Sequence, residues 1–132
     1  MRYLIDTDMV IDTLDALPDT VRLLERLTAD GAAISIITYA EICQGILESP
    51  TPEDAQATFE RFLAGIPVLP FSSAVAWRFA RLRSGLMRQG KRVRTRVFDL
   101  VIAATALEHG LELVTRNTDD YKDIPGLTRY QL

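Results

Sequence analysis

Hydrophobic and polar positions divide this chain into two alternating kinds of segment. Short apolar runs predict strands over residues 2–5, 32–37, 66–69 and 111–114, with a short fifth strand over 127–130. Apolar residues spaced three or four apart predict helices over residues 9–17, from Pro18 to Gly31, and over 38–48, 53–64, 73–88 and 97–108. Strands that alternate with helices favour right-handed crossovers and a mainly parallel sheet.

The predicted fold class is therefore α/β in three layers, with a short, mainly parallel sheet of four to five strands between two layers of helices. The segment Val97–Glu108 is apolar on nearly every side, so we expect this helix to be buried. A length of 132 residues suits one domain, and we expect residues 1–132 to form it.

Composition narrows the class of protein. With 48% hydrophobic and 25% charged residues, the chain is typical of soluble globular proteins and unlike disordered or fibrous ones. A single cysteine excludes an internal disulfide framework and a cysteine-based zinc site. No apolar run is long enough to span a bilayer, and no signal-like segment opens the chain, so we expect a cytoplasmic protein without a membrane partner.

Charge is unevenly distributed along the sequence. Residues 1–66 carry 12 acids and 4 bases, whereas residues 67–132 carry 6 acids and 11 bases. A basic segment around Gly90 contains Arg88, Lys91, Arg92, Arg94 and Arg96. Such a segment suits contacts with phosphates, and it equally suits a solvated loop or a surface that faces a partner.

Acidic residues follow the predicted strands or open the helices behind them. These positions hold Asp6, Asp8, Glu41, Asp99, Asp119 and Asp120, and the amide Asn117 stands among them. Each has an ordinary structural interpretation: Thr38 and Glu41 have the spacing of a capping box, Asp6 or Asp8 suits an N-cap, Asp99 complements a helix dipole, and the Asn117 segment suits a turn.

Taken together, the acids favour a catalytic role over these structural interpretations. The carboxyl ends of parallel strands meet at one edge of a sheet, and carboxylates gathered there repel one another unless a cation lies between them. Oxygen ligands without histidine or cysteine select hard ions, Mg²⁺ or Mn²⁺ in particular. Such an ion lowers the pKa of bound water and stabilises displacement at phosphorus, so hydrolysis of a phosphodiester is predicted.

Four segments carry a family resemblance. They are Tyr-Leu-Ile-Asp-Thr-Asp at 3–8, Ile-Thr-Tyr-Ala-Glu-Ile-Cys-Gln-Gly at 37–45, Phe-Asp-Leu-Val-Ile-Ala-Ala-Thr-Ala at 98–106, and Leu-Val-Thr-Arg-Asn-Thr-Asp-Asp-Tyr with Pro-Gly-Leu at 113–127. In this order, over nearly the whole chain, they resemble PIN-domain ribonucleases, and more narrowly the VapC toxins of bacterial toxin–antitoxin pairs. The resemblance implies a PIN-like fold.

The resemblance also implies roles for individual residues. Asp6, Glu41 and Asp99 fall on the family's metal-binding, catalytic acids, and Thr38 on its small polar position before the glutamate. Asn117 stands where the family has a fourth acid, so Asp119 or Asp120 is an alternative for that role, or Asn117 holds a metal-bound water. Asp8 replaces the asparagine more often found there and adds a carboxylate.

By the same resemblance, Asp6 and Asp99 hold Mg²⁺, or Mn²⁺, while Glu41 binds the ion or activates the attacking water. Cleavage leaves a 5′-phosphate and a 3′-hydroxyl, and Arg116 joins the basic segment in guiding RNA. The implied partners are an RNA substrate, a second copy in a homodimer and a cognate VapB-type antitoxin. Operator DNA is bound only through the antitoxin.

Two alternatives remain at this point. Asp6-Thr7-Asp8-Met9-Val10 also resembles the opening of haloacid-dehalogenase-type phosphatases, with Asp6 as nucleophile, although no lysine occurs before Lys91 and Glu41 has no task there. The other alternative is a non-catalytic PIN module that binds RNA or a partner, which the amide at Asn117 keeps open.

Overall fold

The computed structural model describes residues 1–132 and contains one four-stranded sheet in the order β3-β2-β1-β4. The strands are β1 Tyr3–Ile5, β2 Ala32–Ser35, β3 Val68–Leu69 and β4 Glu112–Val114. Tyr3 of the central strand β1 pairs with Ala32 on one side and Glu112 on the other. All three neighbouring pairs are parallel, which confirms the predicted sheet type.

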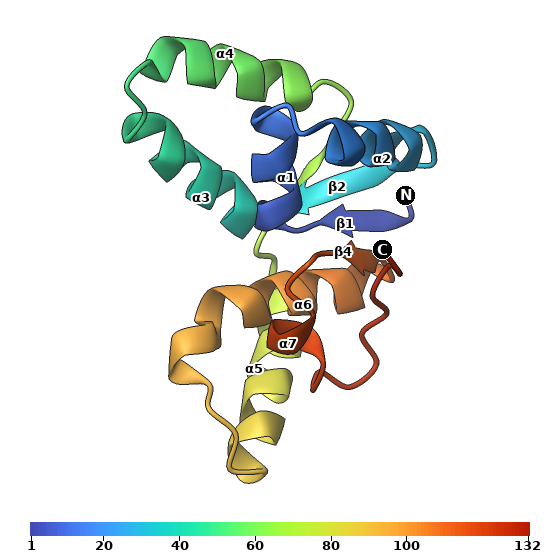
Figure 1. Cartoon of the computed structure of the whole chain (residues 1–132). Coiled ribbons are helices and arrows are strands. Elements are labelled where there is room, and N and C mark those ends of the chain that lie inside the picture. The colour runs from blue at the N-terminus through green and yellow to red at the C-terminus, as the bar shows by residue number, and fades with distance from the viewer.

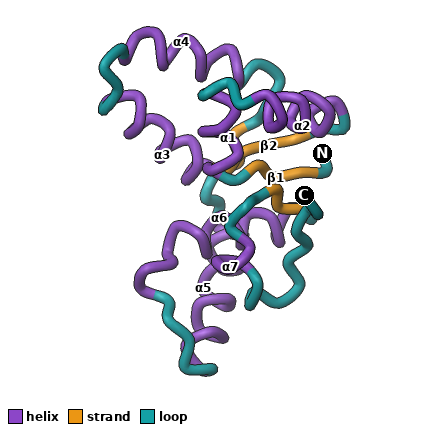
Figure 2. Tube along the Cα trace, viewed as in Figure 1, coloured by secondary structure: helices purple, strands orange, loops and turns teal.

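Helices cover both faces of this sheet. They are α1 Thr7–Leu14, α2 Pro18–Ala29, α3 Ile36–Leu47, α4 Pro52–Phe62, α5 Ser73–Arg88, a 3₁₀ turn Arg94–Arg96, α6 Val97–His109 and α7 Thr118–Tyr121. Helices α1–α4 lie on one side of the strands and α5–α7 on the other (Figure 1). The strands form a thin middle layer between the two groups (Figure 2), so the three-layer prediction is confirmed. No helix combines the length and the apolarity that a membrane crossing requires.

Alternation along the strands produces the two halves of the core. Tyr3 and Ile5 of β1 pack with the cluster under α1–α4, whereas Leu4 packs with the cluster under α5–α7. Successive strand residues point to opposite faces, so a strand of three residues is buried on both. Helix α6 contributes seven buried residues, which confirms the prediction that it is enclosed.

Two predicted boundaries were wrong because a capping residue lies earlier than expected. The second strand ends at Ser35 rather than residue 37, since the Ser35 hydroxyl accepts a hydrogen bond from the Thr38 amide (3.1 Å) and starts α3 at Ile36. Likewise Asp6 caps α1, so this helix begins at Thr7. It ends before Ala16, whose φ of 58° lies in the left-handed region and breaks the helix.

The end of the chain also differs from prediction. The expected fifth strand over 127–130 is reduced to a single parallel bridge between Leu113 and Arg129. The segment after Asn117, which was interpreted as a turn, forms the short helix α7 and buries Tyr121. Sequence periodicity cannot reveal a helix of four residues, because it offers only one turn.

Candidate active site

Asp6 lies directly after β1 and is nearly inaccessible, with 3% of its surface exposed. Its Oδ1 accepts a hydrogen bond from the Thr7 amide (2.8 Å), and its Oδ2 accepts one from the Thr115 hydroxyl (2.8 Å). Burial raises the pKa of Asp6 from 3.8 to about 6, and the Asp8 carboxylate adds to this rise while the hydrogen bonds oppose it. Asp6 is therefore a buried carboxylate with no positive partner.

Glu41 projects from the second turn of α3 toward α1. Its Oε1 accepts a hydrogen bond from the Thr7 hydroxyl (2.7 Å), which is also hydrogen-bonded to the Thr38 hydroxyl (3.0 Å). The capping-box interpretation of Thr38 and Glu41 is wrong, because Ser35 caps the helix and Glu41 turns away from the helix start. Thr7, which sequence reasoning missed, instead connects Glu41 to the residue next to Asp6.

Asp99 lies in the first turn of α6 and is half-buried. Its Oδ1 accepts a hydrogen bond from the hydroxyl of Tyr121 (3.3 Å). Burial raises the pKa of Asp99, and the charges of Asp120 and Glu41 raise it further. Glu41 thus acts electrostatically on Asp99, although the two residues lie 58 positions apart in the sequence.

Tyr121 connects the two aspartates. Its hydroxyl donates a hydrogen bond to Asp99 and lies near enough to Asp6 to lower the pKa of that carboxyl. Burial raises the pKa of Tyr121, and the negative charges of both aspartates raise it further, so its hydroxyl remains protonated and donates. Sequence reasoning missed this residue, because an aromatic residue in a predicted turn carries no signal of a contact with distant acids.

The three residues weighed for the fourth acidic position differ in their surroundings. Asn117 is exposed, and its backbone amide, not its side chain, is engaged, donating to the Thr115 hydroxyl (3.0 Å). Asp119 is exposed and forms an ion pair with Lys122 (3.6 Å). Asp120 is the only one of the three whose charge acts on Asp99.

Asp8 is held by Arg116 rather than aimed at the other acids. Its Oδ2 accepts a hydrogen bond from the Arg116 amide (2.9 Å), and the Arg116 guanidinium forms an ion pair with Asp12 (2.7 Å). This arrangement ties the loop after β4 to α1. Arg116 is half-exposed but already paired with two carboxylates.

The basic segment divides into paired and unpaired residues. Arg96 donates two hydrogen bonds to Asp123 (2.6 and 2.9 Å), which lower the pKa of that acid, and Lys91 lies 3.5 Å from the same carboxylate. The exposed Arg88, Arg92 and Arg94 form no ion pair, so their charges face solvent.

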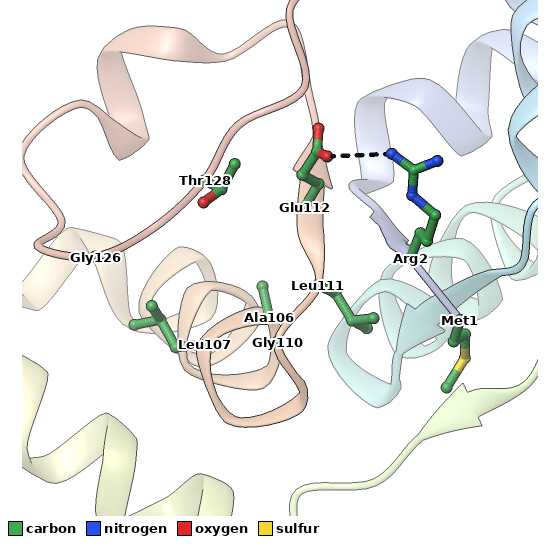
Figure 3. A pocket seen from close by; sticks show the side chains of 9 residues that line it. All are labelled: Met1, Arg2, Ala106, Leu107, Gly110, Leu111, Glu112, Gly126 and Thr128. Carbon is green, nitrogen blue, oxygen red and sulfur yellow. Dashed lines mark ion pairs between the residues drawn. The ribbon is translucent and has the colours of Figure 1, made fainter.

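A pocket of about 380 Å³ adjoins the acids. It is lined by Glu41, Arg94, Thr95, Val97, Phe98 and Asp99. Phe98 is 57% exposed, unusual for a large apolar ring. A second pocket, of about 350 Å³, lies at the opposite end of the strands (Figure 3), where Arg2 and Glu112 form an ion pair of 3.9 Å. That pocket contains no group of acids.

The donor atoms at this edge of the sheet are all oxygens. No three acidic, histidine or cysteine side chains are grouped as a ready metal site, and hydroxyl groups of Thr7, Thr115 and Tyr121 engage the carboxylates. Mg²⁺ nevertheless needs only one or two carboxylates, since it retains several waters. Asp6 and Asp99, whose pKa values burial raises and neither of which forms an ion pair, fit such an ion.

Comparison with known proteins defines the class. Residues 3–127 match the family model described as PIN domain, so the chain belongs to the PIN-domain family. Among curated relatives, it is 34% identical to the tRNA(fMet)-specific endonuclease VapC of Shigella flexneri. It is 31% identical to the protein of the same name from Salmonella typhimurium, and each match covers 96% of this chain and 95% of the relative. The predicted resemblance to VapC proteins is confirmed.

Solved structures agree with this assignment. A DNA-bound VapBC complex from Salmonella typhimurium contains a chain with a TM-score of 0.89 and 30% identity, over 98% of this chain and 97% of that one. A VapBC2 complex from Rickettsia felis, bound to a promoter DNA fragment, contains a chain with a TM-score of 0.88 and 28% identity, over 100% of this chain and 99% of that one. The haloacid-dehalogenase alternative is therefore abandoned, and in addition Arg116 occupies the Asp8 carboxylate that would serve as its acid.

Proposed function

We propose that this chain is a toxin endoribonuclease of a VapBC toxin–antitoxin system that hydrolyses RNA phosphodiester bonds. The observation that carries the proposal is the grouping of three acids at one edge of a PIN-type sheet: Thr7 is hydrogen-bonded to both Asp6 and Glu41, the Glu41 charge acts on Asp99, and Tyr121 is hydrogen-bonded to Asp99. Relatives that cover almost the whole chain are named as VapC endonucleases. The proposal takes residues 1–132 as one catalytic domain.

The proposed chemistry depends on a divalent metal, Mg²⁺ by preference and Mn²⁺ as a substitute. Asp6 and Asp99 hold the ion, which supplies charge stabilisation at phosphorus and a more acidic water. Glu41 orients the attacking water and accepts its proton. Because water is the nucleophile, the products carry a 5′-phosphate and a 3′-hydroxyl. We assign the fourth acidic role to Asp120, whose charge acts on Asp99, in place of Asn117.

RNA approaches this site over the basic segment. Arg88, Arg92 and Arg94 are exposed and unpaired, so they contact phosphates. Arg96, Lys91 and Arg116 instead form ion pairs with acids of the chain. The exposed ring of Phe98, beside Asp99, offers a surface on which an unpaired base stacks. An RNA with a single-stranded loop suits these features better than a regular duplex.

A toxin of this kind requires an inhibitor in its own cell. We propose a VapB-type antitoxin that covers the acids, since structural relatives of this chain are found in VapBC complexes. Binding to operator DNA is then a property of the antitoxin. A homodimer of the toxin is the proposed assembly, because the apolar helices of small domains commonly pair across a two-fold axis.

The proposal is tested by sequencing RNA 5′ ends after induced expression of the wild-type chain and of Asp6→Ala. We expect new ends bearing 5′-phosphates with the wild type only. The initiator tRNA is the first substrate to examine in vitro, because the Shigella and Salmonella relatives are named for it. Cleavage there must stop with EDTA and resume with Mg²⁺.

The same experiment separates this function from a non-catalytic RNA-binding module. A chain that retards tRNA in a gel but generates no metal-dependent ends on cellular RNA contradicts the enzyme assignment. Asn117→Asp is the informative variant in that case, because it restores the acid that the family has at this position. A gain of cleavage would show that the amide is responsible for the inactivity.

A further inference from the structure

Tyr121 is a buried polar residue to which the proposed mechanism gives no task. Its side chain is 1% exposed and belongs to the core cluster that includes Leu100 and Ile102 of α6. Only the hydroxyl leaves this apolar environment. It donates a hydrogen bond to Asp99 Oδ1 (3.3 Å) and lies near enough to Asp6 to lower the pKa of that carboxyl.

The position of this hydroxyl matters because neither carboxylate has a basic partner. Neither Asp6 nor Asp99 forms an ion pair with a basic side chain, since no lysine, arginine or histidine nitrogen lies within 4.0 Å of either. A phenol is protonated at neutral pH and offers one donor, which it can give to either carboxylate. A neutral donor held between two anions fixes their separation without neutralising them.

The surrounding hydrogen bonds show that each acid has a separate anchor. Thr115, in the loop after β4, anchors Asp6. Thr7, in α1, anchors Glu41. Tyr121 anchors Asp99, and it is the only one of these hydroxyls that also acts on a second acid, Asp6. Asp99 Oδ2 accepts no hydrogen bond from the chain, so it is left for a ligand.

We propose that Tyr121 is a positioning residue, whose hydroxyl holds Asp6 and Asp99 at the spacing in which both bind a divalent ion. The inference rests on the proposed function, because it assumes that these aspartates bind a metal. Outer partners of metal ligands typically change metal affinity by about 10–100-fold when they are removed. The same range applies here, because the Tyr121 hydroxyl is the only hydrogen-bond donor to the Asp99 carboxylate.

The test is a calorimetric titration of Mn²⁺ into the metal-free chain, comparing the wild type with Tyr121→Phe. The substitution removes one oxygen and keeps the buried ring. The matched control is Tyr130→Phe, which makes the same change on a half-buried tyrosine that packs against Tyr3 and lies 3.5 Å from Arg26. We expect Mn²⁺ to bind Tyr121→Phe about 10–100-fold more weakly than the wild type and Tyr130→Phe unchanged.

Thermal unfolding in EDTA and at rising Mn²⁺ concentrations provides a second measurement, which also serves if Tyr121→Phe is too unstable for calorimetry. A lower unfolding temperature with unchanged Mn²⁺ affinity overturns the inference, since Tyr121 would then be only structural. Equal or tighter binding by Tyr121→Phe overturns it as well. If the wild type binds no Mn²⁺, the proposed function fails, and this inference fails with it.

Discussion

At the scale of single residues, the burial of Asp6 lowers the stability of the metal-free chain, and its proposed role as a metal ligand accounts for that cost. Asp6 is buried without a positive partner, and burial raises its pKa to about 6. A carboxylate that served only as a helix cap would remain near the surface, where its charge is solvated. Asp6 caps α1 and is buried as well, which supports its proposed role as a metal ligand.

This burial predicts a reversed pH dependence for the metal-free protein. Between pH 3.8 and about pH 6 the folded chain keeps a proton on Asp6 that the unfolded chain has released, so this group lowers stability as the pH rises. Asp6→Asn removes the charge and keeps a good N-cap residue. In EDTA, we expect its free energy of unfolding, relative to that of the wild type, to rise by about 2 kcal/mol between pH 4 and pH 7. Urea unfolding measures the difference, and a gap independent of pH contradicts the raised pKa.

The second prediction at this scale concerns Asp99. Asp99→Asn keeps the shape of the side chain but removes its negative charge. Loss of that charge at the start of α6 costs less than about 1 kcal/mol of dipole stabilisation. We expect a folded protein whose metal-dependent cleavage is lower by orders of magnitude. Thermal unfolding and a cleavage assay on the same preparation check both parts. Undiminished cleavage would remove Asp99 from the site.

At the scale of elements, periodicity located the helices and strands, but caps decided where they begin. The apolar spacing of residues 38–48 indicated a helix, and Thr38 with Glu41 imitated its start. The actual start is fixed by Ser35, a buried hydroxyl at the end of β2. That shift of three residues in the cap turned Thr38 toward Thr7 and freed Glu41 for the site.

Ser35→Ala tests this cap. The substitution removes the acceptor for the Thr38 amide, and we expect the free energy of unfolding to fall by about 1 kcal/mol. Thr51→Ala is the matched control, because Thr51 occupies the N-cap position of α4 but forms no side-chain cap hydrogen bond. Urea unfolding of the two variants should therefore separate them. Equal losses would mean that Ser35 does not act as a cap.

At the scale of the whole molecule, the site depends on segments that the fold brings from distant parts of the sequence. The loop after β4 meets α1 through Arg116 and Asp8, and the basic segment meets the segment after α7 through Arg96 and Asp123. The basic residues looked alike in the sequence. The fold gives them different tasks, since Arg96 is mostly buried in its ion pair and Arg94 is exposed beside the acids.

This difference predicts a separation of effects between Arg96→Gln and Arg94→Gln. Arg96→Gln leaves Asp123 with a weaker partner, so we expect a lower unfolding temperature. Arg94→Gln should leave that temperature unchanged, weaken RNA binding and reduce its salt dependence by about one phosphate contact. Gel-shift titrations at several salt concentrations with an inactive Asp6→Ala background measure the second effect. Loss of stability in both variants would contradict the division.

The sequence by itself determined the alternation of strands and helices, the three layers and the order of the acidic segments, because hydrophobic period and strand-end chemistry are local properties. Tertiary structure decided which hydroxyls hold the acids, which arginines remain free, and that Tyr121 reaches both Asp6 and Asp99. These contacts join residues up to 109 positions apart, as between Asp6 and Thr115. No local pattern encodes them, since they depend on how the parallel strands align their ends.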